Sequence, residues 1–297
     1  MARTGHPPLD WAEAAEADIV RWCEDRDDVR AAIVTSTRAL PNNATDRFSD
    51  LDVILVLTDI TTLARHRDWL SDFGEVLVSW RDDEALAGDP PRTCFVTQYR
   101  DGRKIDFTLW PSELLCLITS RSALPDELDV GYRVIVDKDG MAAALSRATH
   151  RAHIPRRPST TDFAALVESF FHEATYVAKH LSREDLLPAK YSLDHVMKQM
   201  DLRRMLEWRI EIDHDWTHRP GAYGKALKKM LPPERYRQLE RTYVGPELTD
   251  NWDALFATIA LFREVAMEVA NALGLDYCTE LDANLSAYLL HIRSESR

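Results

Sequence analysis

The sequence predicts an α+β protein in which a mixed-sheet domain is followed by an all-helical domain. Short β-type runs alternate with turns and short helical patterns between about residues 30 and 137. From about residue 160 onward, apolar residues recur with helical period in nearly every segment. The stretch 150–161 (HRAHIPRRPSTT) is basic and proline-rich, which is typical of a linker that leads into a helix N-cap. We therefore predict two domains, at 1–152 and 153–297.

The elements of the first domain follow from their apolar spacing. A helix is predicted at 10–23, because its apolar residues share one helical face. Strands are predicted at 31–34, 50–57, 75–80, 93–100, 103–110 and 133–137. Asp101-Gly102 separates two alternating runs, and an Asp-Gly pair in that position is a strong hairpin signal. The 50–57 run is continuously apolar after its first three residues, so both faces of that strand should be covered.

The second domain consists of helical patterns throughout. We predict helices at 161–181, 187–213, 222–230, 233–243, 249–273 and 280–292. Their aromatic residues fall at helical spacing, which favours core packing over a ligand pocket.

The composition excludes several classes of protein. Of 297 residues, 45% are hydrophobic and 29% charged, which is an ordinary globular balance. No apolar stretch approaches the ~18 residues of a membrane span, and the acidic N-terminus shows no secretory signal. The four cysteines are scattered without a CxxC spacing, which suits a reducing cytoplasm. A formal net charge of -12 makes the chain a poor candidate for binding nucleic acid.

Three acidic residues stand at strand positions where a carboxylate is costly. Asp50 and Asp52 open the most apolar strand, and residues i and i+2 of a strand point to the same face. Asp106 lies in the middle of a second predicted strand. In a chain this acidic, Asp-x-Asp also occurs by chance. The Asp50/Asp52 pair alone is therefore a weak indication of a metal site. If the two strands are neighbours, the three carboxylates converge as two-metal nucleotidyl transfer with Mg²⁺ requires.

A polar turn, Thr35-Ser36-Thr37-Arg38, precedes the acidic strand. Its small hydroxyl residues can donate hydrogen bonds to phosphate oxygens, and Arg38 can add a charge-assisted pair. Taken alone, the turn is better explained as a plain polar loop.

These residues lie in segments that resemble the aminoglycoside 6-adenylyltransferase (streptomycin adenylyltransferase) family of the DNA polymerase β-like nucleotidyltransferase superfamily. The similar segments of the first half are AAIVTSTRALPNNATDRFSDLDVILVLTD, KIDFTLWP and RVIVDKDG. Those of the helical half are TYVAKHLSRE, LRRMLEWRIE, YGKALKKMLP, RTYVGPE and NWDALFATIALFREVAMEVA. The resemblance implies a nucleotidyltransferase domain followed by a helical substrate- and ATP-binding domain, with the active site in the cleft between them.

The resemblance implies roles for residues of the first domain. Asp50 and Asp52 match the Mg²⁺-binding pair, and Asp106 matches the third carboxylate, a metal ligand or general base. Ser36 and Thr37 take the place of a Gly-Ser phosphate-binding pair, and the following Arg is also present. Because Gly allows close backbone approach to a phosphate, Ser36 could lower activity, change the substrate or mark a chain that binds without catalysing.

The resemblance also implies roles in the helical half. Arg204, Lys225 and Tyr243 resemble positions that, with Arg38, contact ATP. Asp194 resembles an acidic position that holds the aminoglycoside.

The implied activity is Mg²⁺-dependent O-adenylylation of a streptomycin-type aminoglycoside hydroxyl, with two Mg²⁺ ions as cofactors, ATP as co-substrate, pyrophosphate as product and antibiotic resistance as the result. Two alternatives stay open: a nucleotidyltransferase with a different acceptor, and a non-catalytic homologue that binds nucleotide or drug. We expect a cytoplasmic monomer or dimer that binds the cationic aminoglycoside and ATP, and neither nucleic acid nor a membrane.

Overall fold

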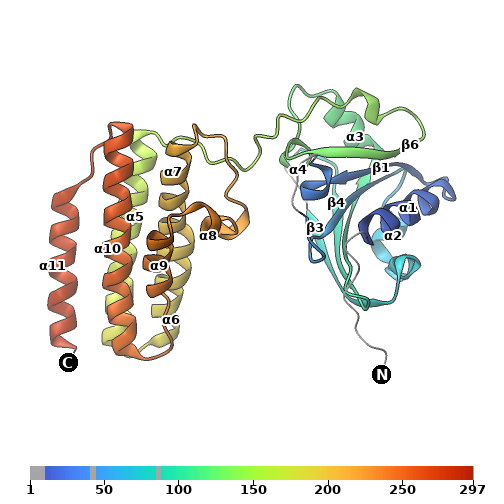
Figure 1. Cartoon of the computed structure of the whole chain (residues 1–297). Helices are drawn as coiled ribbons and strands as arrows, with labels where there is room; N and C mark the ends of the chain where they lie inside the picture. Colours follow the sequence, from blue (N-terminus) through green and yellow to red (C-terminus); the bar gives the residue numbers. More distant parts are fainter. Residues whose placement is uncertain (1–10, 41–44, 85–87, 297) are drawn as a thin grey trace. The chain divides into compact units, whose positions relative to one another are not determined.

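The chain folds into two compact units, Met1–Ala152 and His153–Arg297. The computed structural model describes residues 11–40, 45–84 and 88–296, and Figure 1 shows the elements of each unit. The first residue of the predicted N-terminal helix, Asp10, lies outside the described residues. Each unit is built around its own buried apolar clusters.

The first unit contains a six-stranded mixed sheet in the order β3-β4-β5-β2-β1-β6. The strands are β1 (Val29–Thr35), β2 (Leu51–Leu57), β3 (Val76–Glu84), β4 (Arg92–Tyr99), β5 (Lys104–Pro111) and β6 (Tyr132–Asp137). Neighbouring strands are antiparallel except β2 and β5, which are parallel. The six predicted strands are confirmed, and β4 and β5 form the predicted hairpin around Asp101-Gly102.

Helices cover the two faces of this sheet unequally. One face packs against α1 (Trp11–Glu24), α2 (Thr61–Arg65) and the 3₁₀ turn η2 (Asp68–Phe73). The other face packs against α3 (Ser112–Thr119), α4 (Asp126–Asp129) and the 3₁₀ turn η3 (Ala142–Ala144). This second cluster covers β1, β2 and Trp110 near the end of β5, whereas Val78 and Trp80 on β3 stay exposed. The expectation that β2 is covered on both faces is confirmed, since every residue after Asp52 is buried.

The second unit is helical. Its longest helices, α5 (Thr160–Ser182), α10 (Leu248–Leu273) and α11 (Thr279–Glu295), lie side by side (Figure 1). The other segments are α6 (Leu186–Lys190), the π-helical η4 (Tyr191–Leu202), α7 (Arg203–Asp213), the 3₁₀ turn η5 (Ala222–Gly224), α8 (Leu227–Met230) and α9 (Pro233–Arg241). The predicted N-cap is confirmed, because Ser159 and Asp162 form a capping box at the start of α5.

Two predicted helices are subdivided in the structure. The stretch predicted as one helix at 187–213 consists of α6, η4 and α7 in direct succession. Apolar spacing reports which face is buried and does not distinguish an α turn from the wider π turn. The stretch predicted at 222–230 is interrupted because Tyr223 and Gly224 have left-handed backbone, with φ of 54 and 76. Among the helices of the described ranges, none has the length and apolarity to cross a membrane.

Candidate active site

The pairing of β2 with β5 brings the three predicted carboxylates together. Asp52 is the register partner of Asp106, and paired residues of neighbouring strands point to the same face about 4.8 Å apart. Asp50 directly precedes β2 and shares a lysine partner with Asp106. The sequence expected this convergence only if the two strands were neighbours, and the sheet order makes them so.

Lys104 lies between two of these carboxylates. Its ammonium nitrogen is 2.5 Å from Oδ2 of Asp50 and 2.8 Å from Oδ2 of Asp106. Burial alone lowers the pKa of Lys104, but hydrogen bonds to Asp106 and Asp50 overcome it and raise that pKa to about 12. The ammonium is therefore charged at neutral pH and offsets part of the repulsion among the acids.

Asp52 has unfavourable electrostatic surroundings. Burial, together with the charges of Asp106 and Asp50, raises the pKa of Asp52 to about 6. A hydrogen bond with Ser36 acts in the opposite direction. Burial also raises the pKa of Asp106, against the effect of its hydrogen bonds from Lys104 and from the backbone N–H of Thr97. Both carboxyl groups would gain from a nearby cation.

The donor set suits a hard divalent cation. Carboxylate oxygens are the ligands that Mg²⁺ takes in sites that also bind substrate phosphates. Three facing carboxylates carry more negative charge than the single ammonium of Lys104 can neutralise. Within the described ranges, no three His, Cys, Asp or Glu side chains already surround a common metal position. Asp50, Asp52 and Asp106 thus fit Mg²⁺ by chemistry and would be the residues that hold it.

The predicted phosphate-binding turn has a backbone conformation that glycine adopts more readily than other residues. Ser36 starts the 3₁₀ turn η1 (Ser36–Ala39) directly after β1 and has left-handed backbone, with φ 63. That conformation costs about 1–2 kcal/mol for a residue with a Cβ, whereas Gly adopts it freely. Ser36 therefore preserves the shape of the turn and adds a hydroxyl that hydrogen-bonds Asp52. Thr37 beside it is exposed.

Arg38 ties the turn to the start of the acidic strand. Its guanidinium donates to the carbonyl oxygen of Ser49 at 2.6 Å and to that of Asp50 at 2.9 Å. It also stacks over the buried ring of Trp11, 4.7 Å from the ring centroid. Two of its three nitrogens thus hold backbone oxygens, so Arg38 positions Asp50 in addition to its predicted role toward phosphate.

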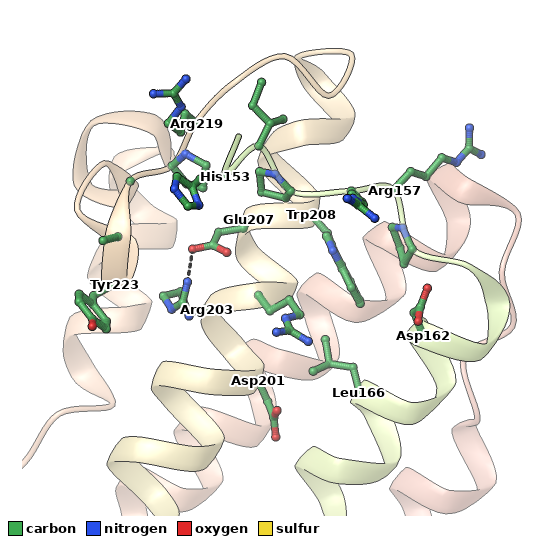
Figure 2. A pocket seen from close by; sticks show the side chains of 18 of the residues that line it. His153, Arg157, Asp162, Leu166, Asp201, Arg203, Glu207, Trp208, Arg219 and Tyr223 are labelled. Carbon is green, nitrogen blue, oxygen red and sulfur yellow. Dashed lines mark hydrogen bonds and ion pairs between the residues drawn. The ribbon is translucent and has the colours of Figure 1, made fainter. Parts of the chain in front are cut away.

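The helical unit contains a pocket of about 840 Å³ with many arginines, which we call the arginine pocket (Figure 2). Its lining includes five guanidinium groups, from Arg156, Arg157, Arg203, Arg204 and Arg219. Three acids also line it, Asp162, Asp201 and Glu207. Arg203 donates to Glu207 at 2.6 Å, as the dashed line in Figure 2 marks. One guanidinium group can donate two parallel hydrogen bonds to the oxygens of a phosphate. Because the arginines of this pocket outnumber its acids, the lining favours an anionic ligand.

The structure does not gather the three predicted ATP contacts of the helical half into one pocket. Arg204 lines the arginine pocket. Tyr243 lines a neighbouring pocket of about 260 Å³, which shares Arg203 and Tyr223 with the first. Lys225 is exposed and lines neither of these two pockets.

Asp194, the predicted aminoglycoside contact, has lysine partners on both carboxylate oxygens. Lys190 lies 2.6 Å from Oδ2, and the fully buried Lys198 lies 2.7 Å from Oδ1. Lys198 also donates to the carbonyl oxygen of Thr242. These two lysines compete with a cationic drug for Asp194, whose role stays a prediction.

Sequence reasoning missed two residues with partners at these sites, Lys104 and Asp201, whereas it considered Glu207 as a possible lining of an acidic cleft for a cationic ligand. Lys104 carried no role, because a lysine at a strand start is usually a solvated side chain. Asp201 and Glu207 are buried acids in the arginine pocket, and burial raises the pKa of Asp201 to about 6. Helical spacing places Asp201 among buried residues, which was the available signal, since an acid on a buried face requires a partner.

Three carboxylates and a hydroxyl turn gathered on the central strands of a mixed sheet, followed by a helical unit, are the arrangement expected of a nucleotidyltransferase. A family model described as streptomycin adenylyltransferase matches residues 13–292. The chain therefore belongs to the streptomycin adenylyltransferase family, which confirms both the predicted family and the predicted class of enzyme.

The names of curated relatives agree with this assignment. The chain is 28% identical over 269 residues to an aminoglycoside 6-adenylyltransferase of Campylobacter jejuni, covering 88% of each protein. It is 26% identical over 266 residues to that of Bacillus subtilis (strain 168), covering 88% of this chain and 90% of the relative. Among solved structures, an aminoglycoside 6-adenyltransferase from Bacillus subtilis is similar, with a TM-score of 0.47 and 22% identity over 93% of this chain and 96% of that one.

Proposed function

We propose that this enzyme transfers AMP from ATP to a hydroxyl of a streptomycin-type aminoglycoside in a Mg²⁺-dependent reaction that releases pyrophosphate and gives antibiotic resistance. The observation that carries the proposal is the meeting of Asp50, Asp52 and Asp106 beside the Ser36 turn. Membership of the family supports adenylyl transfer, and the curated relatives are named for an aminoglycoside acceptor.

The bond changes assign a task to each acid. The acceptor oxygen attacks the α-phosphorus, the bond from that phosphorus to the bridging oxygen breaks, and pyrophosphate leaves with the electron pair. Asp106, which lies next to Asp52 in the sheet, takes the hydroxyl proton as general base. Asp50 and Asp52 would hold two Mg²⁺ ions together with Asp106. Mg²⁺ bound there neutralises the polyphosphate and stabilises the charge of the transition state.

Residues beside the acids, and others in the helical unit, are assigned to the nucleotide. Ser36 and Thr37 are assigned to the phosphate oxygens; the Ser36 hydroxyl, which hydrogen-bonds Asp52, would have to turn from that carboxylate to donate to a phosphate. Arg38 keeps Asp50 in position through its backbone carbonyl. Arg204 supplies positive charge in the arginine pocket, and we assign Lys225 and Tyr243 to the same nucleotide. Asp194 is assigned to the cationic acceptor.

An assay of the purified chain with ATP and Mg²⁺ tests the proposal on a panel of streptomycin-type drugs. Pyrophosphate release and the mass of AMP on the drug are measured together. Asp50→Ala should lower turnover by roughly a hundredfold or more, because it removes charge stabilisation that acts on the transition state. Asp276→Ala is the matched control, since Asp276 is an exposed carboxylate of the helical unit.

Each alternative predicts a different outcome of the same assay. Saturable drug binding without pyrophosphate would identify a non-catalytic binding homologue. New mass on an unrelated acceptor, with none on the drugs, would identify a nucleotidyltransferase with another substrate. Turnover that is unchanged in Asp50→Ala would contradict the assignment of the acidic site.

A further inference from the structure

The row of paired residues that contains Asp52 and Asp106 continues across the sheet to an exposed tryptophan. Asp106 pairs with Val96 on β4, and Val96 pairs with Trp80 on β3. Because directly paired residues point to the same face of a sheet, Trp80 lies on the face of the catalytic acids. Two strand spacings, about 10 Å, separate Trp80 from Asp106 along this row.

Contacts of the alternate residues confirm which way Trp80 points. Ser79 bonds Thr97 across β3 and β4, with 3.1 Å between the hydroxyl oxygens, and Arg81 donates to the carbonyl oxygen of Ala64 in α2. Both therefore lie on the face that α1 and α2 cover. Trp80 and Asp82 alternate with them and lie on the opposite, acidic face.

The side chains of this part of the face are open to solvent. Val78 is 60% exposed and Trp80 is 65% exposed. The exposed carboxylate of Asp82 makes no hydrogen bond or ion pair with any residue that the structure describes. We call Val78, Trp80, Asp82 and Val96 the β3 platform.

The geometry of the reaction decides which substrate lies over the β3 platform. The attacking and leaving oxygens lie on opposite sides of the α-phosphorus. The phosphate turn at Ser36 follows β1, so the leaving pyrophosphate belongs on the β1 side of Asp52. The acceptor hydroxyl must then approach from the other side, over β5, β4 and β3.

We infer that the β3 platform is the acceptor subsite, where Trp80 stacks against a cationic sugar and Asp82 pairs with one of its ammonium or guanidinium groups. An aromatic face attracts a cation that lies over it, and the indole of Trp is the strongest such ring among the side chains. An acceptor seated on Trp80 can extend a hydroxyl along the row toward Asp106. This inference rests on the proposed function, because that function defines the acceptor side.

Kinetics and binding of three variants test the inference. Trp80→Ala should raise KM for streptomycin about tenfold and leave KM for ATP within twofold. Trp80→Phe keeps an aromatic ring, so its KM for streptomycin should stay close to that of the unaltered protein. Asp82→Asn should raise KM for streptomycin about threefold, and added salt should reduce that difference. Tyr288→Ala is the control for Trp80→Ala, because Tyr288 is an exposed aromatic residue of α11. Asp68→Asn is the control for Asp82→Asn, because Asp68 is an exposed acid of η2, which packs on the opposite face of the sheet. Calorimetric titration of streptomycin into each variant gives affinity without turnover.

The outcomes separate this inference from the proposed function. Turnover with an unchanged streptomycin KM in Trp80→Ala would overturn the subsite and leave the function standing. Saturable binding without turnover, weakened in Trp80→Ala, would overturn the transfer reaction and support the subsite. An equal loss of ATP and streptomycin affinity in Trp80→Ala would show a structural role and overturn the subsite, as would the absence of any streptomycin binding to the unaltered protein.

Discussion

Replacement of Asp52 by asparagine should stabilise the protein while abolishing transfer. The carboxylate is buried beside Asp50 and Asp106, so its charge opposes folding in the absence of a metal ion. Asparagine has nearly the same shape and can still hydrogen-bond Ser36. The substitution therefore removes the charge and leaves the packing in place.

The magnitude follows from the pKa of Asp52. Burial and the two neighbouring acids raise this pKa from 3.8 to about 6, and each pKa unit corresponds to about 1.4 kcal/mol. Because the folded state binds the proton more tightly than the unfolded state, the ionised group destabilises the fold above pH 6. The penalty shrinks as the pH falls through 6 and is absent below 3.8. Asp52→Asn should thus raise the free energy of unfolding by about 3 kcal/mol at pH 8 and by little at pH 4.

Urea and thermal unfolding in EDTA at both pH values measure this difference. For a unit of about 150 residues, 3 kcal/mol corresponds to a rise in Tm of roughly 6–12 °C. Asp25→Asn is the control, because Asp25 is exposed on the same unit and should change stability by less than about 0.5 kcal/mol. A variant no more stable than the unaltered protein at pH 8, or equally stabilised at both pH values, would refute the electrostatic reasoning.

Two further substitutions probe the same site. Ser36→Gly should remove the strain of a left-handed backbone at φ 63 and raise the free energy of unfolding by about 1 kcal/mol. The midpoint of urea unfolding measures this change. A destabilised variant would show that the hydrogen bond from Ser36 to Asp52 outweighs the backbone strain. Lys104→Met should leave Asp50 and Asp106 without their shared ammonium and lower stability by about 1–2 kcal/mol in metal-free buffer. Millimolar Mg²⁺ should then raise the Tm of Lys104→Met more than that of the unaltered protein, and equal shifts would argue against a shared cation position.

Local sequence patterns identified the elements of the sheet unit. The Asp-Gly pair set the hairpin of β4 and β5, and the apolar run after Asp52 predicted a strand covered on both faces. Both signals act over a few residues, because turn geometry and strand burial depend on immediate neighbours. The π-helical geometry of η4 had no such signal, since its buried residues resemble those of an α-helix.

Some residues of the candidate site were also indicated by local sequence patterns, and others were not. The sequence alone indicated Asp50, Asp52 and Asp106, because a carboxylate inside an apolar strand is expensive unless it has a partner. The i,i+4 spacing of Lys190, Asp194 and Lys198 was a further local signal that the sequence reasoning did not use. That Lys198 is buried against the carbonyl oxygen of Thr242 depends on a contact far along the chain.

Residue type and spacing therefore determined that this chain has strands, helices and acids suited to nucleotidyl transfer. Only the tertiary structure decided that β2 lies parallel to β5, that Lys104 bridges Asp50 and Asp106, and that Trp80 continues the same row. The physical reason is that strand order depends on packing between segments distant in the chain, and no local pattern encodes which strands become neighbours.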